Sequence, residues 1–224
     1  VAGFICAFLV IAKLSQRWKI RIDDDAFFTV VFCVIFGVIL GGRLGYVLVY
    51  GDGYYLQHPE KILAFNEGGM SFHGGLVGVI IGGVIAAKIT KIPFLTLADM
   101  GVVGVPIGLF FGRCANFING EMWGAPTDMP WGVVFGGAAG TMPRHPSQLY
   151  EALLEGVVLF IILFALSRKT PARPRGTFFG TFLLLYGLFR FTIELIRQPD
   201  AQIGYLLGTH WFTMGQALSI PLMV

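Results

Sequence analysis

Charged residues are scarce in this chain. They make up 13% of its 224 residues, whereas soluble globular domains carry about 25%. Hydrophobic residues account for 55%, and the mean hydropathy is +0.74. This composition excludes an ordinary soluble domain. The apolar runs are long enough to cross a hydrocarbon layer of about 30 Å, so we expect an integral membrane protein.

Cysteine is also scarce: Cys6, Cys33 and Cys114 lie far apart in apolar segments. No pair has the spacing of a metal site or of a disulfide framework, so we interpret all three as small residues of membrane helices. The carboxylates do not form a tight ligand cluster with histidine either. We therefore expect no metal and no cofactor.

The alternating pattern of strands is missing, because the apolar runs are continuous, which favours helices. We predict an all-α, polytopic integral membrane helix bundle that forms a single domain over residues 1–224. About seven transmembrane helices are expected, at residues 1–14, 26–50, 72–90, 94–114, 147–167, 176–197 and 205–224. Because the chain begins without Met and stops at Val224 inside apolar runs, we expect the first and last helices to be truncated.

The basic residues concentrate in alternate connections. The first, third and fifth connections hold ten of the sixteen, namely Lys13, Arg17, Lys19, Arg21, Lys88, Lys91, Arg168, Lys169, Arg173 and Arg175. Cytoplasmic loops carry an excess of Lys and Arg, so these connections belong on the cytoplasmic side. The long connections 51–71 and 115–146 are then periplasmic-side loops. The net charge of +3 says little, and we expect no nucleic-acid partner.

Glycines recur at four-residue spacing in three sets: Gly37, Gly41 and Gly45; Gly74, Gly78 and Gly82; and Gly104, Gly108 and Gly112. Small residues at this spacing share one helix face and let two backbones approach closely. We expect helix packing at these faces and therefore a compact bundle.

The most informative polar residues follow an apolar run over residues 98–111. They are Arg113, Asn116, Asn119 and Glu121, at the expected end of that helix. A charge at the bilayer centre costs roughly 2.5–3.5 kcal/mol even on insertion scales, so such residues need partners or a polar cavity. Packing gives no reason to place them there, whereas a site for a polar or anionic group does.

A second polar stripe consists of Tyr186, Arg190, Glu194 and Arg197, at i, i+4, i+8 and i+11 of one helix. Glu194 can pair with either arginine at this spacing. One glutamate cannot neutralise two arginines, so we expect a surplus of positive charge that could attract a phosphate. The alternative is an arginine that anchors the helix at the membrane interface by snorkelling.

Three other groups have two interpretations each. Gln148, Glu151 and Glu155 form a stripe that could supply counter-charges to the arginines or take part in catalysis. Arg43 lies deep in the second helix and is either a site residue or an anchor. His73 begins the third helix and is either structural or a proton acceptor, since the ordinary pKa of histidine is about 6.5.

Five segments carry a resemblance to a known family: Gly-Gly-Arg-Leu-Gly-Tyr at 41–46, Gly-Gly-Met-Ser-Phe-His-Gly-Gly-Leu at 68–76, Gly-Arg-Cys-Ala-Asn-Phe-Ile-Asn-Gly-Glu-Met-Trp-Gly at 112–124, Arg-His-Pro-Ser-Gln-Leu-Tyr-Glu at 144–151, and Tyr-Gly-Leu-Phe-Arg-Phe-Thr-Ile-Glu-Leu-Ile-Arg-Gln-Pro-Asp at 186–200. In this order they resemble segments of the bacterial prolipoprotein diacylglyceryl transferases. The family commonly has glycine in place of Ala115, and its tyrosine of the first helix would precede Val1.

The resemblance implies an enzyme that transfers the diacylglyceryl group of phosphatidylglycerol to the lipobox cysteine of a preprolipoprotein, the first step of lipoprotein maturation. The product is a thioether, and glycerol phosphate leaves. The implied location is the bacterial cytoplasmic (inner) membrane, with the active site toward the periplasm. The implied partners are phosphatidylglycerol, the preprolipoprotein signal peptide and the lipid bilayer.

The resemblance also assigns roles to residues of this chain. Arg113 and Arg190 would bind the lipid phosphate, and His73 is the debated base that would take the thiol proton. The predicted substrate-binding residues are Asn116, Asn119, Glu121 and Gly124 around the head group, Tyr186 and Glu194 beside Arg190, and Arg43, which we add because of its depth in the second helix.

Two other functions remain open on the sequence alone. A transporter or channel also carries charges within the membrane, but it predicts polar residues across the whole bilayer and internal repeats. Here the polar residues gather toward one side. A lipid-binding scaffold without chemistry is the third function. Thioether formation on a lipobox peptide in the presence of phosphatidylglycerol would separate the transferase from both.

Overall fold

The computed structural model describes the chain apart from residues 1, 21, 51–52, 66–67, 169–173, 199–204, 207 and 210, and apart from the side chains of residues 2, 4, 49–50 and 72–73. Within these described residues every regular element is a helix, and β pairing is limited to isolated bridges. The all-α prediction is therefore confirmed for the described part of the chain.

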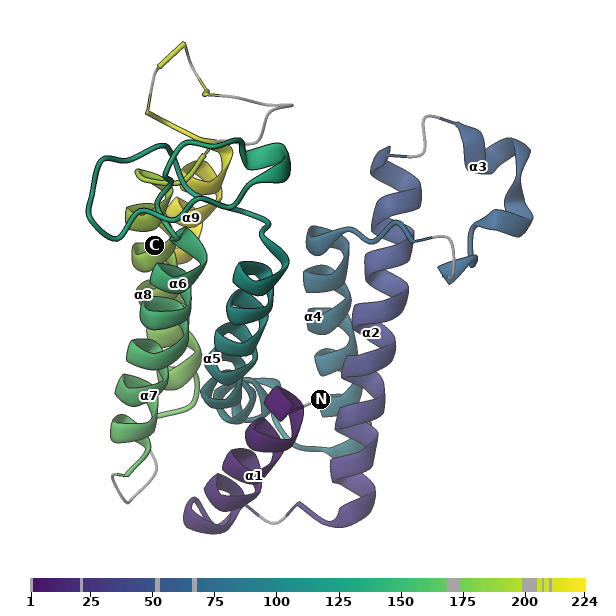
Figure 1. Ribbon diagram of the computed structural model, residues 1–224. Helices are drawn as coiled ribbons and strands as arrows, with labels where there is room; N and C mark the ends of the chain where they lie inside the picture. The colour runs from purple at the N-terminus through teal and green to yellow at the C-terminus, as the bar shows by residue number, and fades with distance from the viewer. Residues whose placement is uncertain are drawn as a thin grey trace. The chain divides into compact units, whose positions relative to one another are not determined.

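The helices follow one another along the chain as shown in Figure 1. They are α1 (Ala2–Arg17), α2 (Asp24–Tyr50), α3 (Tyr54–Gln57), η1 (Pro59–Lys61), α4 (Phe72–Thr90), α5 (Phe94–Asn119), η3 (Gly137–Ala139), α6 (Ser147–Glu151), η4 (Ala152–Val158), α7 (Leu159–Ser167), α8 (Thr177–Glu194) and α9 (Met214–Met223). In the part of the chain that the structure describes, three segments are long and apolar enough to cross a membrane, namely Asp24–Leu48, Phe94–Asn119 and Ser147–Ser167, and Gly74–Thr90 is a shorter apolar helix. These helices support a membrane bundle, whereas the number of seven spans stays a prediction.

Two helix boundaries differ from those predicted from the sequence. α5 continues to Asn119 instead of residue 114, and it ends where Gly120 takes a left-handed φ of 67°. Arg113 therefore lies inside the last turns of a helix, and the connection that we expected at 115–146 begins at residue 120. α9 begins at Met214 instead of residue 205, because the Thr213 side chain forms a capping box at that point.

The described residues divide into two compact units. One unit is Ile20–Ala98, and the other combines Val1–Lys19 with Asp99–Val224. Each unit is described by itself below. The single domain over residues 1–224 stays a prediction.

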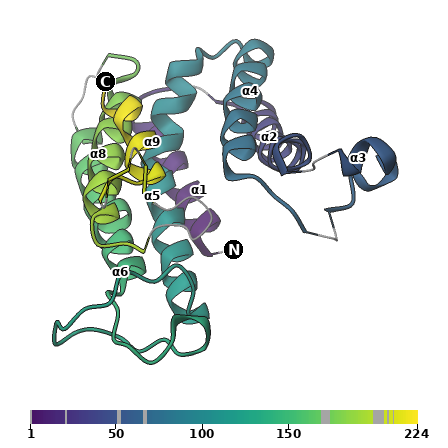
Figure 2. The ribbon, with the colours of Figure 1, turned by 90° about the horizontal axis from the view of Figure 1, so that it is seen from above.

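In the unit Ile20–Ala98, α2 and α4 lie side by side (Figures 1 and 2). A Cβ atom added to Gly78 would fall on the carbonyl oxygen of Gly37, and one added to Gly45 would lie 2.6 Å from the Gly74 Cα. No side chain fits in such a space, so the close approach expected for the first two glycine sets is confirmed.

The third glycine set behaves differently. A Cβ on Gly104 would lie 3.1 Å from the Ala7 Cβ, which indicates tight packing of α5 on α1. The Gly108 Cα would lie 3.5 Å from a Cβ added to Gly3 of α1, so the two helices are also close there. Around Gly112, however, an added Cβ would meet no heavy atom of the described residues within 4 Å, and the prediction of close packing is wrong for this position.

The core of the other unit is apolar and is built from four helices. Its fully buried members include Leu14 of α1, Val103 of α5, Leu159 and Leu163 of α7, and Phe178 of α8. α6, η4 and α7 form one continuous helix, in which Ala152–Val158 is π-helical. π-Helical segments are rare and occur frequently at functional sites.

Asp99 of α5 fixes the beginning of α8. Its buried carboxylate accepts hydrogen bonds from the backbone N–H groups of Gly176 at 2.7 Å and Phe179 at 2.8 Å. The first N–H groups of a helix have no partner within the helix, so a carboxylate there acts as a cap and stabilises the helix dipole. α8 is therefore held against α5 at the end where it begins.

The α2–α4 contact generates a prediction about stability. Gly78→Ala should lower the free energy of unfolding by about 1–3 kcal/mol, because the new methyl group meets the Gly37 backbone, which cannot move aside easily. The measurement is thermal or denaturant unfolding in detergent micelles.

Gly75→Ala on the same helix is the matched control. Its Cβ would lie 3.7 Å from the Val38 carbonyl oxygen, which is an ordinary contact distance. Because alanine favours a helix over glycine by about 1 kcal/mol, this variant should be as stable as the parent or more so. Equal stability of the two variants would contradict close packing at Gly78.

Candidate active site

Ion pairs join α5, the helix that begins with α6, and α8. We call this group the arginine–glutamate cluster, and its members are Arg113, Glu151, Glu155, Arg190, Glu194 and Arg197. All six residues lie in the unit that contains Asp99–Val224. The two polar stripes of the sequence and the polar end of α5 therefore meet in one place.

Glu151 lies at the centre of the cluster. Its Oε2 atom is 2.8 Å from Arg113 Nε, and its Oε1 atom is 2.5 Å from Arg190 Nη1. The side chain of Glu151 is buried, and the two arginines are only 15% and 13% exposed. One carboxylate thus holds together the two residues that the family resemblance assigns to the lipid phosphate.

Glu194 extends the cluster along α8. Its Oε2 atom is 2.8 Å from Arg190 Nη2 and 3.7 Å from Arg197 Nη1. α8 ends at Glu194, so Arg197 lies beyond the helix and does not continue the expected helical stripe. It stays beside Glu194 because its backbone forms an antiparallel bridge with Gly124.

The expected surplus of positive charge is wrong in formal terms. The cluster contains three guanidinium groups and three carboxyl groups. Glu151 and Glu155 come from a neighbouring helix, and spacing along α8 could not reveal them. Of the two interpretations of that glutamate stripe, the structure favours the supply of counter-charges.

The outer nitrogens of Arg113 are bound weakly. Nη1 lies 3.8 Å from the Sδ atom of Met122, and a thioether is a poor acceptor. Nη2 lies 3.7 Å from Glu155 Oε2, which is too far for a hydrogen bond. Glu155 itself is fully buried, and neither of its oxygens has a hydrogen-bond partner among the described residues. This edge of Arg113 is therefore well suited to accept another anion.

The amide side chains near the end of α5 converge on one carboxylate. Asn116 and Asn119 donate hydrogen bonds from their Nδ2 atoms to Glu121 Oε1, at 2.8 and 3.2 Å. These bonds, that from Asn116 foremost, hold the pKa of Glu121 below its ordinary value, so the carboxylate is ionised at neutral pH. Gln148 Nε2 donates to the Glu121 carbonyl at 2.6 Å and thereby ties this turn to α6.

Gly124 has a structural reason to be glycine. Its N–H donates to the His145 carbonyl at 2.9 Å. An added Cβ would lie 2.7 Å from that carbonyl oxygen and 2.9 Å from the oxygen of Ile196. The backbone of Gly124 thus passes between the start of α6 and the turn after α8, where no side chain fits.

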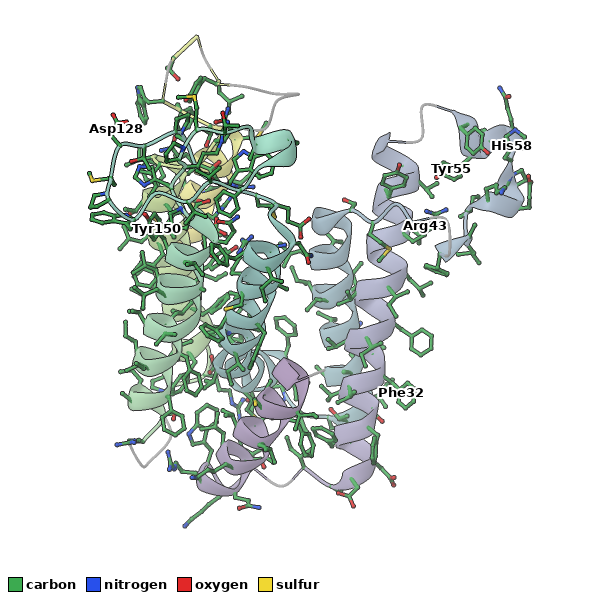
Figure 3. All side chains as sticks on the ribbon, viewed as in Figure 1. Phe32, Arg43, Tyr55, His58, Asp128 and Tyr150 are labelled. Carbon is green, nitrogen blue, oxygen red and sulfur yellow. The ribbon has the colours of Figure 1, made fainter. Side chains whose placement is uncertain are left out.

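Arg144 holds the connection between α5 and α6 in place. Its guanidinium group donates to the carbonyls of Ala139 at 2.9 Å and Gly124 at 3.3 Å, and to the Gln198 side chain at 2.9 Å. Earlier in the same connection, Trp131 Nε1 donates to the hydroxyl of Tyr150 on α6 at 2.7 Å. Figure 3 labels Tyr150 beside this connection.

For two other predicted site residues, Tyr186 and His73, the structure gives fewer contacts. Tyr186 lies one turn before Arg190 on α8, and its ring stacks on Phe182 with centroids 5.6 Å apart. His73 lies in the first turn of α4, and its side chain is outside the described residues. Its role as a base stays a prediction.

Arg43 makes contacts of a different kind. It is 1% exposed, and Figure 3 shows it on α2 near the segment that contains α3. Its nitrogens donate to the carbonyls of Lys61 at 2.7 Å, Ile62 at 2.8 Å, Gly68 and Gly69. These bonds hold the connection between α2 and α4, so the contacts give Arg43 a structural task, and substrate binding by it stays a prediction.

The predicted site residues omitted the central member of the cluster, Glu151. A signal was present, because a glutamate stripe on an apolar helix needs counter-charges as much as the arginines do. Met122 gave no such signal, since a methionine in a polar motif is usually a packing residue.

Comparisons with known proteins show the family of this chain. The family model described as prolipoprotein diacylglyceryl transferase matches residues 1–224. The phosphatidylglycerol–prolipoprotein diacylglyceryl transferase of Geobacter sulfurreducens is 52% identical over 224 residues, which cover 100% of this chain and 84% of the relative. Proteins of the same name from Nitratidesulfovibrio vulgaris and Pasteurella multocida are 49% and 48% identical, over 95% and 99% of this chain and 78% and 81% of their own lengths.

The family model matches the whole chain, and the relative from Geobacter sulfurreducens is about half identical to it. The chain belongs to the prolipoprotein diacylglyceryl transferase family and is a transferase of lipoprotein biosynthesis.

Proposed function

We propose that the arginine–glutamate cluster binds the phosphate of phosphatidylglycerol while the diacylglyceryl group passes to the lipobox cysteine of a preprolipoprotein. The observation that carries this proposal is the attachment of Arg113 and Arg190 to the single carboxylate of Glu151. Two guanidinium groups at this spacing can donate to one phosphate from two sides, which is the geometry that arginine suits best.

The chemistry places the largest change in charge on the phosphate. The cysteine thiol loses its proton to a base. The sulfur then attacks the carbon of the diacylglyceryl group that is bonded to the phosphate oxygen. A carbon–sulfur bond forms, the bond from that carbon to the phosphate oxygen breaks, and glycerol phosphate leaves with the bonding electrons. A phosphodiester with one negative charge thus becomes a phosphomonoester that carries more, and donors aimed at it stabilise the transition state.

A cluster that is formally neutral can still bind this anion. Among the described residues, the Nη atoms of Arg113 have only a thioether and a distant carboxylate as partners, so a phosphate oxygen would replace poor contacts with charge-assisted hydrogen bonds. Glu151 and Glu194 keep Arg190 oriented meanwhile. The glutamates therefore act as supports that hold the arginines in position for the lipid.

The turn after α5 is suited to the head group. Asn116 and Asn119 orient the carboxylate of Glu121, which is exposed, and a carboxylate accepts hydrogen bonds from hydroxyl groups. We assign this turn to the glycerol of the head group, with Gly124 holding the turn in place and Tyr186 and Glu194 beside Arg190. His73 remains our candidate for the base that takes the thiol proton.

The location follows from the same assignment. Basic connections on the cytoplasmic side would place the end of α5 and the start of α6 toward the periplasm of a bacterial inner membrane. A preprolipoprotein that has begun to cross the membrane would present its cysteine there, beside phosphatidylglycerol in the bilayer.

The phosphate proposal makes a prediction about each arginine. Arg113→Ala and Arg190→Ala should each lower the transfer rate by on the order of a hundredfold, or about 3 kcal/mol in transition-state stabilisation. The measurement is thioether formation on a synthetic lipobox peptide in vesicles that contain phosphatidylglycerol.

Arg168→Ala is the control for these variants, because Arg168 is exposed at the end of α7 and contacts the Phe164 ring. It should transfer at the parental rate. Near-full transfer by either cluster variant would refute the phosphate role, and binding of lipid without any thioether in the parent would favour the scaffold.

Glu151→Gln tests the shared support. The amide keeps the shape of the side chain but removes the negative charge that Arg113 and Arg190 share. We expect transfer to fall at least tenfold and the free energy of unfolding to fall by about 1–3 kcal/mol, because two largely enclosed guanidinium groups lose a charged partner. Both transfer and chemical unfolding are measured on the same preparation, and a variant that keeps both unchanged would contradict the central position of Glu151.

A further inference from the structure

Gly215, in the first turn of α9, lies directly against the carboxylate of Glu194. A Cβ atom added to Gly215 would be 2.5 Å from Glu194 Cδ, 2.6 Å from Oε1 and 2.7 Å from Oε2. The Glu194 carboxylate therefore occupies the space that any side chain at position 215 would need. Glu194 is 6% exposed, so it is enclosed on its other sides as well.

We propose that Gly215 is a positioning residue for the transfer reaction. Because it has no side chain, the Glu194 carboxylate can pack against the first turn of α9 and stay in contact with Arg190. This inference rests on the proposed phosphate role of Arg190. It adds α9 to the support of the site, although no residue of α9 belongs to the arginine–glutamate cluster.

α9 cannot easily retreat from α8. The Thr213 hydroxyl accepts from the Gln216 N–H, and the Gln216 side chain accepts from the Thr213 N–H, so the first turn of α9 is closed by a capping box. Thr213 and Gln216 are both buried. Farther along, a Cβ on Gly187 of α8 would lie 3.0 Å from the Ser219 carbonyl oxygen, which shows that the helices are also close there.

The side chain of Glu194 is the part that can move. Because the atoms next to the added methyl group are the end of a flexible side chain, Gly215→Ala displaces the carboxylate instead of separating the helices. Glu194 Oε2 then leaves its position 2.8 Å from Arg190 Nη2, and among the described residues Arg190 keeps only Glu151 as an ion-pair partner. A small displacement of a binding group can reduce a rate about a hundredfold.

A second physical effect acts in the same direction. A carboxylate near the first turn of a helix is stabilised by the helix dipole. Glu194 has this position relative to α9, and the added methyl group moves it away from the turn. The dipole therefore favours the same carboxylate position that the ion pair with Arg190 requires.

The test separates position from stability. Gly215→Ala should lower transfer to the lipobox peptide by on the order of tenfold to a hundredfold. Its thermal midpoint in detergent should fall only slightly, because the helix propensity gained with alanine offsets part of the weakened ion pair between Glu194 and Arg190. Gly180→Ala on α8, where an added Cβ meets no described atom within 4 Å, should keep the parental rate.

A double variant supplies the stricter test. Glu194→Asp shortens the side chain by one methylene group and by itself should lower transfer. Combined with Gly215→Ala, the shorter carboxylate has room beside the methyl group, so the double variant should transfer faster than Gly215→Ala alone. Additive losses in the double variant would overturn the inference.

The outcomes distinguish this inference from the proposed function. Parental transfer by Gly215→Ala, alongside a hundredfold loss in Arg190→Ala, would overturn the role of Gly215 and leave the phosphate role in place. Full transfer by Arg190→Ala would overturn both. A much lower thermal midpoint in Gly215→Ala without rescue by Glu194→Asp would assign Gly215 to helix packing and overturn its positioning role.

Discussion

The site depends on the attachment of two guanidinium groups to one buried carboxylate. Glu151 contacts Arg113 of α5 on one side and Arg190 of α8 on the other. Charges removed from water are costly unless they are paired, and the loss of one partner leaves an uncompensated charge. Three helices must therefore stay in register around Glu151.

Several contacts fix this register at the level of the backbone. Asp99 caps α8 from α5, and a Cβ on Gly156 of η4 would lie 2.8 Å from the Phe110 Cβ, so η4 and α5 are in close contact. Gly124 passes between the start of α6 and the end of α8. Because backbone contacts leave little room for adjustment, the arginines are held in one orientation, as the proposed binding of a phosphate requires. Such preorganisation is the usual source of electrostatic stabilisation in enzymes.

Much of the fold could be predicted from local properties of the chain. Apolar runs located α2, α4, α5 and the helix 147–167 within a few residues, since membrane helices are set by length and hydropathy. Errors arose where an end depends on a cap, as at Gly120 and Thr213. The open surroundings of Gly112 among the described residues also escaped prediction, because spacing shows which residues share a face but not what faces them.

The sequence by itself determined the family and the helical class and named the arginines of the candidate site, because identities and spacing are properties of the chain alone. Only the tertiary structure decided which carboxylate each arginine contacts. It matched Glu151 with both Arg113 and Arg190, assigned Arg43 to a set of backbone carbonyls, and placed Gly215 against Glu194. The physical reason is that a charge in a membrane protein takes its nearest partner in space, and helices distant in sequence supply that partner.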